Sequence, residues 1–258
     1  MSPKNLTLIK QTCGLGFQLA KAEFKLRNEG SYLGIFWYLL NPILTFSVLY
    51  FIFADKLGSG IQYYSAYLLL GIILFNLFQT ITTESTKSIL REYHYLIKSI
   101  NFPRESLILS IVLKHVFAHI FECILFCVLL VSTGISLIGM LYYIPLIILF
   151  VLFIYGFSLL ISALTVYFVD LDNIWSFAIR IIWFGTPIFY MLDSSTLLHT
   201  LNMINPLYYF ISTGRDLIIY QTTPSLILSI GTILWSICFL SLGTVVFSRL
   251  KIKFAELI

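Results

Sequence analysis

Hydrophobic residues in this 258-residue chain are gathered into six long stretches that polar segments separate. Each stretch is about 20 residues long or longer, which is enough for a helix to cross a hydrocarbon core of about 30 Å. We therefore expect an all-α membrane protein with six transmembrane helices. The expected spans are 35–54, 63–83, 106–133, 141–168, 174–192 and 226–248.

Three segments outside these spans have patterns of their own. Residues 5–29 carry a basic stripe opposite a leucine stripe, which is typical of an amphipathic helix in the membrane interface. This helix is either a topological anchor or also a contact for a cytoplasmic partner. Residues 84–105 are polar, partly helical in spacing and longer than a connector needs, which indicates a docking surface.

The segment 193–225 is too apolar for a free loop and too short for a separate span. It predicts an external hairpin that is re-entrant or lies in the interface. Between the fourth and fifth spans, Asp172 is placed to cap the fifth helix.

Most of the 16 Lys and Arg residues lie in the N-terminal tail, in 84–105 or in the C-terminal tail. Basic residues beside spans are retained in the cytoplasm. We therefore expect a multi-pass protein with both termini and the 84–105 segment on the cytoplasmic side.

Composition narrows the class further. The chain is 59% hydrophobic and 11% charged, whereas a soluble domain has about 25% charged residues. Residues 1–258 are therefore expected to form one membrane domain. The net charge of +4 comes from residues beside the spans, so nucleic acid is not expected as a partner. The four cysteines have neither metal-ligand spacing nor the pattern of a disulfide framework, and no metal site is expected.

Ionisable residues inside the third span form one helix face. His115, His119 and Glu122 recur at i, i+4 and i+7. They form a satisfied polar seam, a polar wall along a transport path, or a proton or metal site. Arg180 in the fifth span is a candidate partner for Glu122.

Aromatic residues make up 17% of the chain. Many Tyr and Trp lie near the expected membrane interfaces, as in an aromatic belt. Others are candidates to line a passage, because aromatic faces suit the apolar C–H faces of sugars. These candidates are Phe36, Trp37, Tyr38, Phe75 and Phe78.

Signatures of catalysis are missing from the sequence. The chain has no Gly-Lys dipeptide, which excludes a Walker A loop, and it has no plausible catalytic set. We expect a protein that is not an enzyme, binds no cofactor of its own and draws energy from an ion gradient or another chain.

Short motifs then follow in order along nearly the whole chain, at 33–42, 97–104, 168–171, 186–190, 205–207 and 247–256. Their order and spacing resemble those of ABC-2 type exporter permeases, and the last motif resembles the polysaccharide-export branch. One departure is Val169, where an Arg is usual.

The resemblance implies a half-transporter in the bacterial cytoplasmic (inner) membrane. It would pair with a second copy of itself and with two copies of a separate ABC ATPase that holds ATP and Mg. The substrate would be a lipid-linked polysaccharide: most closely the O-antigen of lipopolysaccharide, or else capsule or teichoic acid.

The resemblance also implies that the N-terminal helix and the 84–105 segment, a coupling helix in the family, contact the ATPase. The expected contact residues are Lys21, Lys25, Tyr93, Lys98, Phe102 and Arg104.

Two other functions remain open. One is an ABC-2 permease for a small hydrophobic drug or lipid. The other is an ion-coupled carrier that needs no ATPase and uses the ionisable residues inside the spans, namely His115, His119, Glu122 and Arg180.

Overall fold

The computed structural model describes residues 3–29, 34, 36–93, 102–192 and 196–254. These residues contain no strand, so the predicted all-α class is confirmed. The α-helices are α1 (Pro3–Glu29), α2 (Phe36–Leu57), α3 (Tyr64–Lys87), α5 (Glu105–Ser132), α6 (Gly139–Tyr167), α7 (Leu171–Gly185), α8 (Leu197–Asn202), α9 (Pro206–Gly214) and α10 (Leu226–Leu250). Shorter turns of other helix types follow α3, α9 and α10, namely η1 (Ser88–Glu92), η2 (Arg215–Tyr220) and η3 (Lys251–Lys253).

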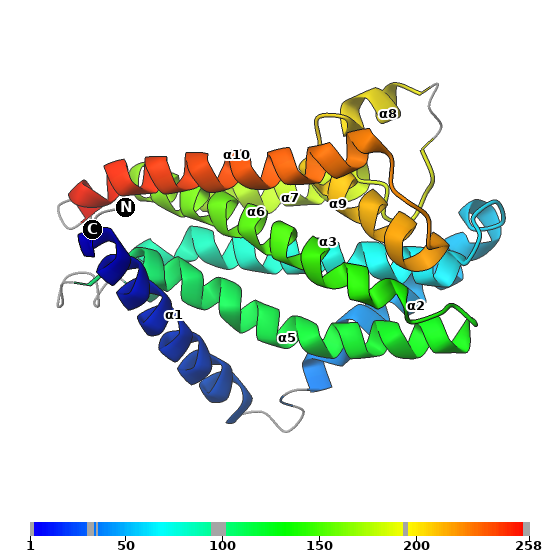
Figure 1. Cartoon of the computed structure of the whole chain (residues 1–258), viewed down its shortest axis with the longest axis horizontal. Helices are drawn as coiled ribbons and strands as arrows, with labels where there is room; N and C mark the ends of the chain where they lie inside the picture. The colour runs from blue at the N-terminus through cyan, green and yellow to red at the C-terminus, as the bar shows by residue number, and fades with distance from the viewer. Residues whose placement is uncertain (1–2, 30–33, 35, 94–101, 193–195, 255–258) are drawn as a thin grey trace.

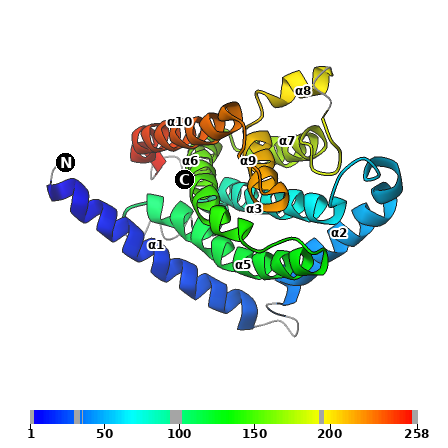
Figure 2. The same ribbon diagram turned by 45° about the vertical axis from the view of Figure 1, so that its right-hand side comes forward.

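The long helices form an elongated bundle. Helix α1 begins and α10 ends toward the same end of it, which we call the terminal end (Figure 1). The opposite end, which we call the distal end, carries α8 and the turns that follow α2 and α5. Helix α1 packs along α5, and the α7–α8 region lies on the opposite flank (Figure 2).

Five helices of the described residues are long and apolar enough to cross a membrane: α2, α3, α5, α6 and α10. Helix α7 has 15 residues, so at about 1.5 Å per residue it is shorter than a hydrocarbon core of about 30 Å. The predicted span 174–192 is therefore wrong in extent, and six full-length spanning helices are not confirmed. Helix α7 stops early because Thr186, which precedes Pro187, is extended.

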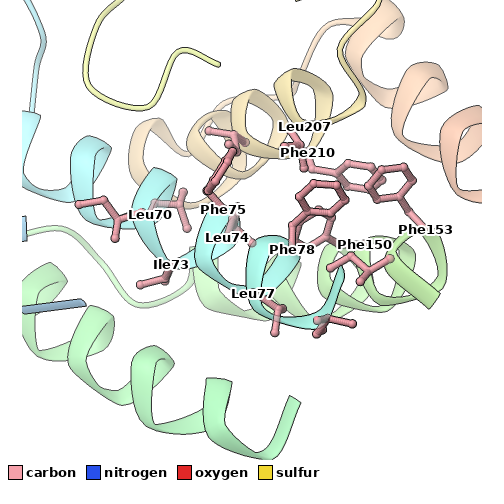
Figure 3. Packing of buried hydrophobic residues seen from close by; sticks show 14 of the residues in the cluster. Leu70, Ile73, Leu74, Phe75, Leu77, Phe78, Phe150, Phe153, Leu207 and Phe210 are labelled. Atoms are coloured by element: carbon pink, nitrogen blue, oxygen red, sulfur yellow. The ribbon is translucent and has the colours of Figure 1, made fainter. Parts of the chain in front are cut away.

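Helix α3 is the centre of the bundle. Its rings Phe75 and Phe78 face the interior among apolar residues of α6 and α9 (Figure 3). Phe78 stacks on Phe153 with ring centroids 5.7 Å apart, and Phe153 stacks on Phe210 at 5.3 Å. Such offset aromatic pairs add to the packing energy of a core. Phe75 and Phe78 are both buried in the single chain, and their predicted role in lining a passage stays a prediction.

Helices α6 and α10 approach each other very closely. A Cβ atom added to Gly243 would lie 1.9 Å from the carbonyl oxygen of Gly156. Small residues allow backbones in a membrane to approach and gain van der Waals contact where hydrophobic association is weak. The glycine contact brings the two backbones together, and beside it the Phe239 ring of α10 packs on Phe153 and Phe157 of α6 with ring centroids 5.2 and 5.3 Å apart.

The hairpin predicted at 193–225 is mostly helical, and residues 193–195 lie outside the described residues. Its α9 and η2 parts pack into the bundle, whereas α8 carries exposed side chains such as Leu197 (76% exposed). Asn205 caps α9 by accepting a hydrogen bond from the Leu207 amide at 3.1 Å. Pro206 follows at the first helical position, which favours the helix start.

Arg215 fixes this hairpin to the rest of the molecule. The buried guanidinium donates to the carbonyl oxygens of Pro187 (2.7 Å), Ile188 (2.9 Å) and Tyr67 (3.2 Å). Its central carbon lies 3.3 Å from the centroid of the Tyr67 ring, a cation–π contact. One side chain therefore joins η2, the segment after α7 and helix α3.

Two predictions at the terminal end are corrected. The predicted second span, 63–83, ends too early, because α3 continues through Glu84 to Lys87 and then into η1. Asp172 does not cap α7: it is buried and accepts a hydrogen bond from the Thr86 hydroxyl at 3.1 Å, and Asp170 occupies the cap position. Residues 94–101 of the expected coupling segment, including Lys98, lie outside the described residues.

Candidate functional site

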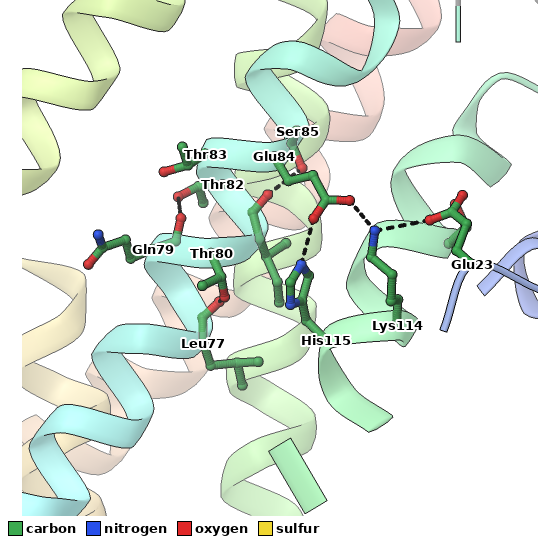
Figure 4. A network of polar contacts seen from close by, with 12 residues as sticks. Glu23, Leu77, Gln79, Thr80, Thr82, Thr83, Glu84, Ser85, Lys114 and His115 are labelled. Carbon is green, nitrogen blue, oxygen red and sulfur yellow. Dashed lines mark hydrogen bonds and ion pairs between the residues drawn. The ribbon is translucent and has the colours of Figure 1, made fainter. Parts of the chain in front are cut away.

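Charged side chains from three helices meet inside the terminal half of the bundle. We call Glu23 of α1, Glu84 of α3, and Lys114 and His115 of α5 the terminal cluster (Figure 4). The Lys114 ammonium contacts the Glu84 carboxylate and lies 3.0 Å from Glu23 Oε2. His115 Nε2 lies 2.7 Å from the other Glu84 oxygen. Glu84 therefore holds both basic groups of α5.

Burial makes this cluster energetically important. Removing one partner from a buried ion pair costs roughly 3–5 kcal/mol, because it leaves an uncompensated charge. In a membrane the cost also forces such groups to face the protein interior. The terminal cluster therefore ties α1 to α3 and α5 through paired charges.

Tyr93, just after η1, extends the terminal cluster. Its hydroxyl donates to a Glu23 carboxylate oxygen. Burial and the neighbouring Glu23 carboxylate raise the pKa of Tyr93, so the phenol stays protonated and keeps donating. This contact joins the end of α3 to α1 a second time.

A second set of contacts at the terminal end ties α10 to α5. Lys251 pairs with Glu105, and the Arg104 guanidinium donates to the Lys251 carbonyl oxygen. The Arg104 guanidinium also lies over the Phe254 ring, 5.7 Å from its centroid. The chain after α10 is thus anchored where α5 begins.

The residues predicted to contact an ATPase divide into two groups. Lys21 and Lys25 are exposed on α1. Tyr93 is buried, Phe102 is half-buried, and Arg104 is bound to the chain after α10. Only the α1 lysines present exposed side chains, and Lys98 lies outside the described residues, so the contact itself stays a prediction.

The upper part of the predicted α5 face forms a separate polar group. His119 Nδ1 lies 2.6 Å from Glu122 Oε2, and His119 Nε2 lies 2.6 Å from the hydroxyl of Tyr143 on α6. Glu122 therefore pairs with His119 instead of Arg180, which is exposed on α7. Within one chain the predicted pairing with Arg180 is not formed.

A pocket of about 230 Å³ lies between α2, α3 and α5, and we call it the polar pocket. Several predicted passage residues meet there, although Phe36, Phe75, Phe78 and Arg180 do not line it. It is lined by Trp37, Tyr38, Asn41, Thr45, Asn76, Leu77, Gln79, Thr80, His115, Ala118, His119 and Glu122.

Predictions from the sequence did not identify the uncharged polar side chains that α3 contributes to this pocket. Asn76, Gln79 and Thr80 recur at i, i+3 and i+4 within an apolar span, which places them on one helix face. That spacing was a usable signal. The partnership of Lys114 with Glu84 also had a signal, because a lysine inside a span requires a carboxylate at similar depth.

A second pocket, of about 390 Å³, lies between α3, α6, α7 and α10 and is also lined by α8, α9 and the turn that joins them. Its walls are apolar and include Phe78, Phe157, Trp175 and Phe239. No group of three metal-ligating side chains occurs in the part of the chain that the structure describes. The chemistry of the bundle is therefore that of paired charges, carboxamides and aromatic rings.

Five helices that are long and apolar enough to cross a membrane, with a polar pocket between three of them, are typical of an integral membrane protein. Residues 15–219 match the family described as ABC-2 type transporter, and the chain belongs to this family. The family comprises membrane subunits of transporters that are not themselves catalytic.

Three relatives carry the same printed name, O-antigen export system permease protein RfbA. Two proteins of Klebsiella pneumoniae are 28% and 27% identical over 247 residues, which is 93% of each chain. One protein of Myxococcus xanthus is 25% identical over 182 residues, which is 70% of each chain.

Proposed function

We propose that this chain is the permease subunit of an ATP-driven exporter that moves lipid-linked O-antigen polysaccharide across the bacterial cytoplasmic membrane. The observation that carries the proposal is the similarity to an O-antigen export permease over 93% of both chains. A relationship through nearly the full length includes every helix that surrounds the polar pocket. It also favours ATP-driven export over the ion-coupled alternative and the export of a small drug.

The working unit in this proposal contains two copies of the chain and two copies of an ABC ATPase. One face of α2 supports the second copy: Leu44, Val48 and Phe51 recur along it, and Phe51 is 89% exposed. A helix face of this kind contacts either lipid or another protein. ATP and Mg would be held by the ATPase, and this chain would supply no cofactor.

The chain is proposed to cross the membrane six times with both termini in the cytoplasm. Helix α1 begins and α10 ends toward the same end of the bundle, which supports an even number of crossings (Figure 1). Helix α7 and the extended residues that follow it would complete the fifth crossing. The α9–η2 hairpin would then lie at the outer surface.

ATPase movement would enter through α1, which would lie in the membrane interface as a coupling element. Lys21 and Lys25 are exposed on α1, and Glu23 between them belongs to the terminal cluster. A push on the outer face of α1 would therefore reach α3 and α5 through Glu23 and Lys114. This route needs no large rearrangement of the buried core.

The ATPase contact is tested by charge reversal. The double variant Lys21→Glu and Lys25→Glu should lose most of the ATPase that co-purifies with the tagged permease from its native membrane. The matched control is Lys56→Glu, which changes an exposed lysine near the distal end of α2. Equal ATPase recovery with the double variant and the control would contradict the coupling role of α1.

The substrate is tested by deletion in the source bacterium. Loss of this chain should remove surface O-antigen and leave lipid-linked polysaccharide inside the cell, and a plasmid copy should restore export. Normal surface O-antigen in the deletion strain, together with new sensitivity to hydrophobic drugs, would overturn the proposed substrate.

A further inference from the structure

The polar pocket contains carboxamide side chains whose hydrogen-bonding groups are not used inside the described part of the chain. Asn41 lies on α2, and Asn76 and Gln79 lie one turn apart on α3. Their amide groups form no hydrogen bond with any described residue. Each amide offers two donors and one acceptor, and leaving these groups bare in hydrocarbon is costly. The pocket must therefore hold water or a polar ligand.

Aromatic rings form the other half of the pocket wall. Trp37 is 49% exposed at the rim, so its indole face is available to a ligand. Tyr38 is held in place by stacking on Phe24 (5.8 Å, 7° between planes) and Phe121 (6.3 Å, 16°). A fixed ring, an exposed ring and several carboxamides suit a ligand with both an apolar face and many hydroxyl groups.

Charge in the pocket favours an uncharged ligand. His119 and Glu122 pair with each other, and His115 pairs with Glu84. Among the described residues that line the pocket, no lysine or arginine is present to hold a phosphate. The nearby Lys114 is already occupied by Glu84 and Glu23.

The volume of the pocket limits how much of a ligand it can enclose. Its volume of about 230 Å³ is smaller than the ~300–1,000 Å³ of pockets that enclose drug-sized molecules. It is open to the outside of a single chain, because Trp37, Asn41 and Thr80 at its edge are exposed. One segment of a longer molecule can therefore enter while the rest remains outside.

We infer that the polar pocket binds one uncharged sugar ring of a polysaccharide, with hydroxyls on Asn41, Asn76 and Gln79 and a C–H face against Trp37. The inference rests on the proposed polysaccharide export and adds the place where the chain holds its substrate. The second, apolar pocket has the wrong walls for this ligand. As the polysaccharide moves, each sugar ring that enters the pocket would displace water and hydrogen-bond to the same three carboxamides.

The test uses the complete permease–ATPase complex in lipid nanodiscs with the substitution Asn76→Cys. A small polar thiol reagent should label this cysteine, and the complex without the substitution gives the background from the four native cysteines. The probe is the polysaccharide released by mild acid from the surface glycan of the source strain. At ten times its Kd, the polysaccharide should slow labelling roughly tenfold.

The matched control is Lys56→Cys, which lies on the same helix as Trp37 but outside the pocket. Its labelling should be unchanged by the polysaccharide. Adding Trp37→Ala to Asn76→Cys should abolish protection, whereas Trp37→Phe should retain part of it. If Asn76→Cys does not fold, Gln79→Cys gives the same measurement from the next helical turn.

Two results would overturn the inference. No labelling above background would mean that protein or hydrocarbon fills the pocket, and labelling that the polysaccharide does not slow would mean that it holds water only. Failure of the proposed function is recognised separately, because it appears as the absence of any co-purifying ATPase. The labelling measurement can then be repeated on the permease alone.

Discussion

Helices α2 and α3 are neighbours whose most apolar 18-residue stretches have the same mean hydropathy, 1.6, but these stretches differ sharply in burial. In the most apolar part of α3, 78% of the residues are buried inside the chain, against 6% in α2. Both sequences meet the requirement for entering a bilayer. Hydropathy therefore predicts that a helix lies in the membrane, whereas the buried fraction shows how much of the helix is covered by the rest of the chain.

The contrast has a physical cause. In lipid, apolar side chains gain little by leaving hydrocarbon for protein, so shape and polar contacts decide which helix becomes central. Helix α3 contributes Glu84 to the terminal cluster, the Tyr67 carbonyl to Arg215 and Phe75 to the aromatic core. The exposed face of α2 that carries Leu44, Val48 and Phe51 is apolar over these residues, and this stretch is expected to meet a second copy.

The largest expected effect is on stability and separates the two helices directly. Phe75→Ala should destabilise the chain by ~3 kcal/mol, at the lower end of values for buried aromatic truncations because lipid is as apolar as the core. Thermal denaturation in detergent measures this as a lower midpoint. The matched variant Phe51→Ala removes an equally large ring that is 89% exposed in the single chain, and it should leave the midpoint of the detergent-solubilised monomer nearly unchanged. Equal losses in both variants would mean that α2 is as well packed as α3.

A smaller effect is expected where α3 supports the distal hairpin. Arg215→Gln removes the charged hydrogen bonds to three backbone carbonyls and should cost ~2 kcal/mol. The loss should be local, so limited proteolysis should cut the 186–225 region faster while α5 and α6 stay protected. The matched control is Arg180→Gln, which changes an exposed arginine on α7 and should leave the cleavage pattern as it is. Uniform proteolysis of the whole chain in the Arg215 variant would contradict a local anchoring role.

The smallest effect on stability is expected from Val48→Cys, which tests directly whether the exposed face of α2 meets a second copy. The substitution lies on the exposed face of α2 and should not change the denaturation midpoint. If this face meets a second copy, mild oxidation should yield a disulfide-linked dimer, because a two-fold interface brings equivalent residues together. Native Cys238, exposed on α10, serves as the internal control. Dimers linked through Cys238 instead of residue 48 would assign the interface to α10.

Much of the fold was predictable from the sequence, and the main exception, the length of α7, has a physical cause. The ends of α5, α6 and α10 lie within about two residues of the predicted spans, because long apolar runs leave little choice. Helix α7 was overestimated because apolar residues continue past the point where Pro187 stops the helix. Hydropathy does not register a change in backbone conformation.

The site was predictable on one helix and unpredictable between helices. The i, i+4, i+7 spacing correctly placed His115, His119 and Glu122 on a common face of α5. Their partners Glu84 and Tyr143 lie on other helices, and a single sequence does not show which faces meet. Glu84 was placed just outside the second span because a carboxylate at the end of an apolar run normally marks the water boundary.

The terminal cluster also constrains how the chain is made. Glu23 and Glu84 leave the ribosome before Lys114, so the first spans reach the translocon while two carboxylates still lack their counter-charge. Helix α3 can leave the insertion machinery with Glu84 neutralised only after α5 has been synthesised. A nascent fragment that ends before residue 105 is therefore expected to be held or degraded by membrane quality control, whereas one that extends past α5 should be released as a stable unit.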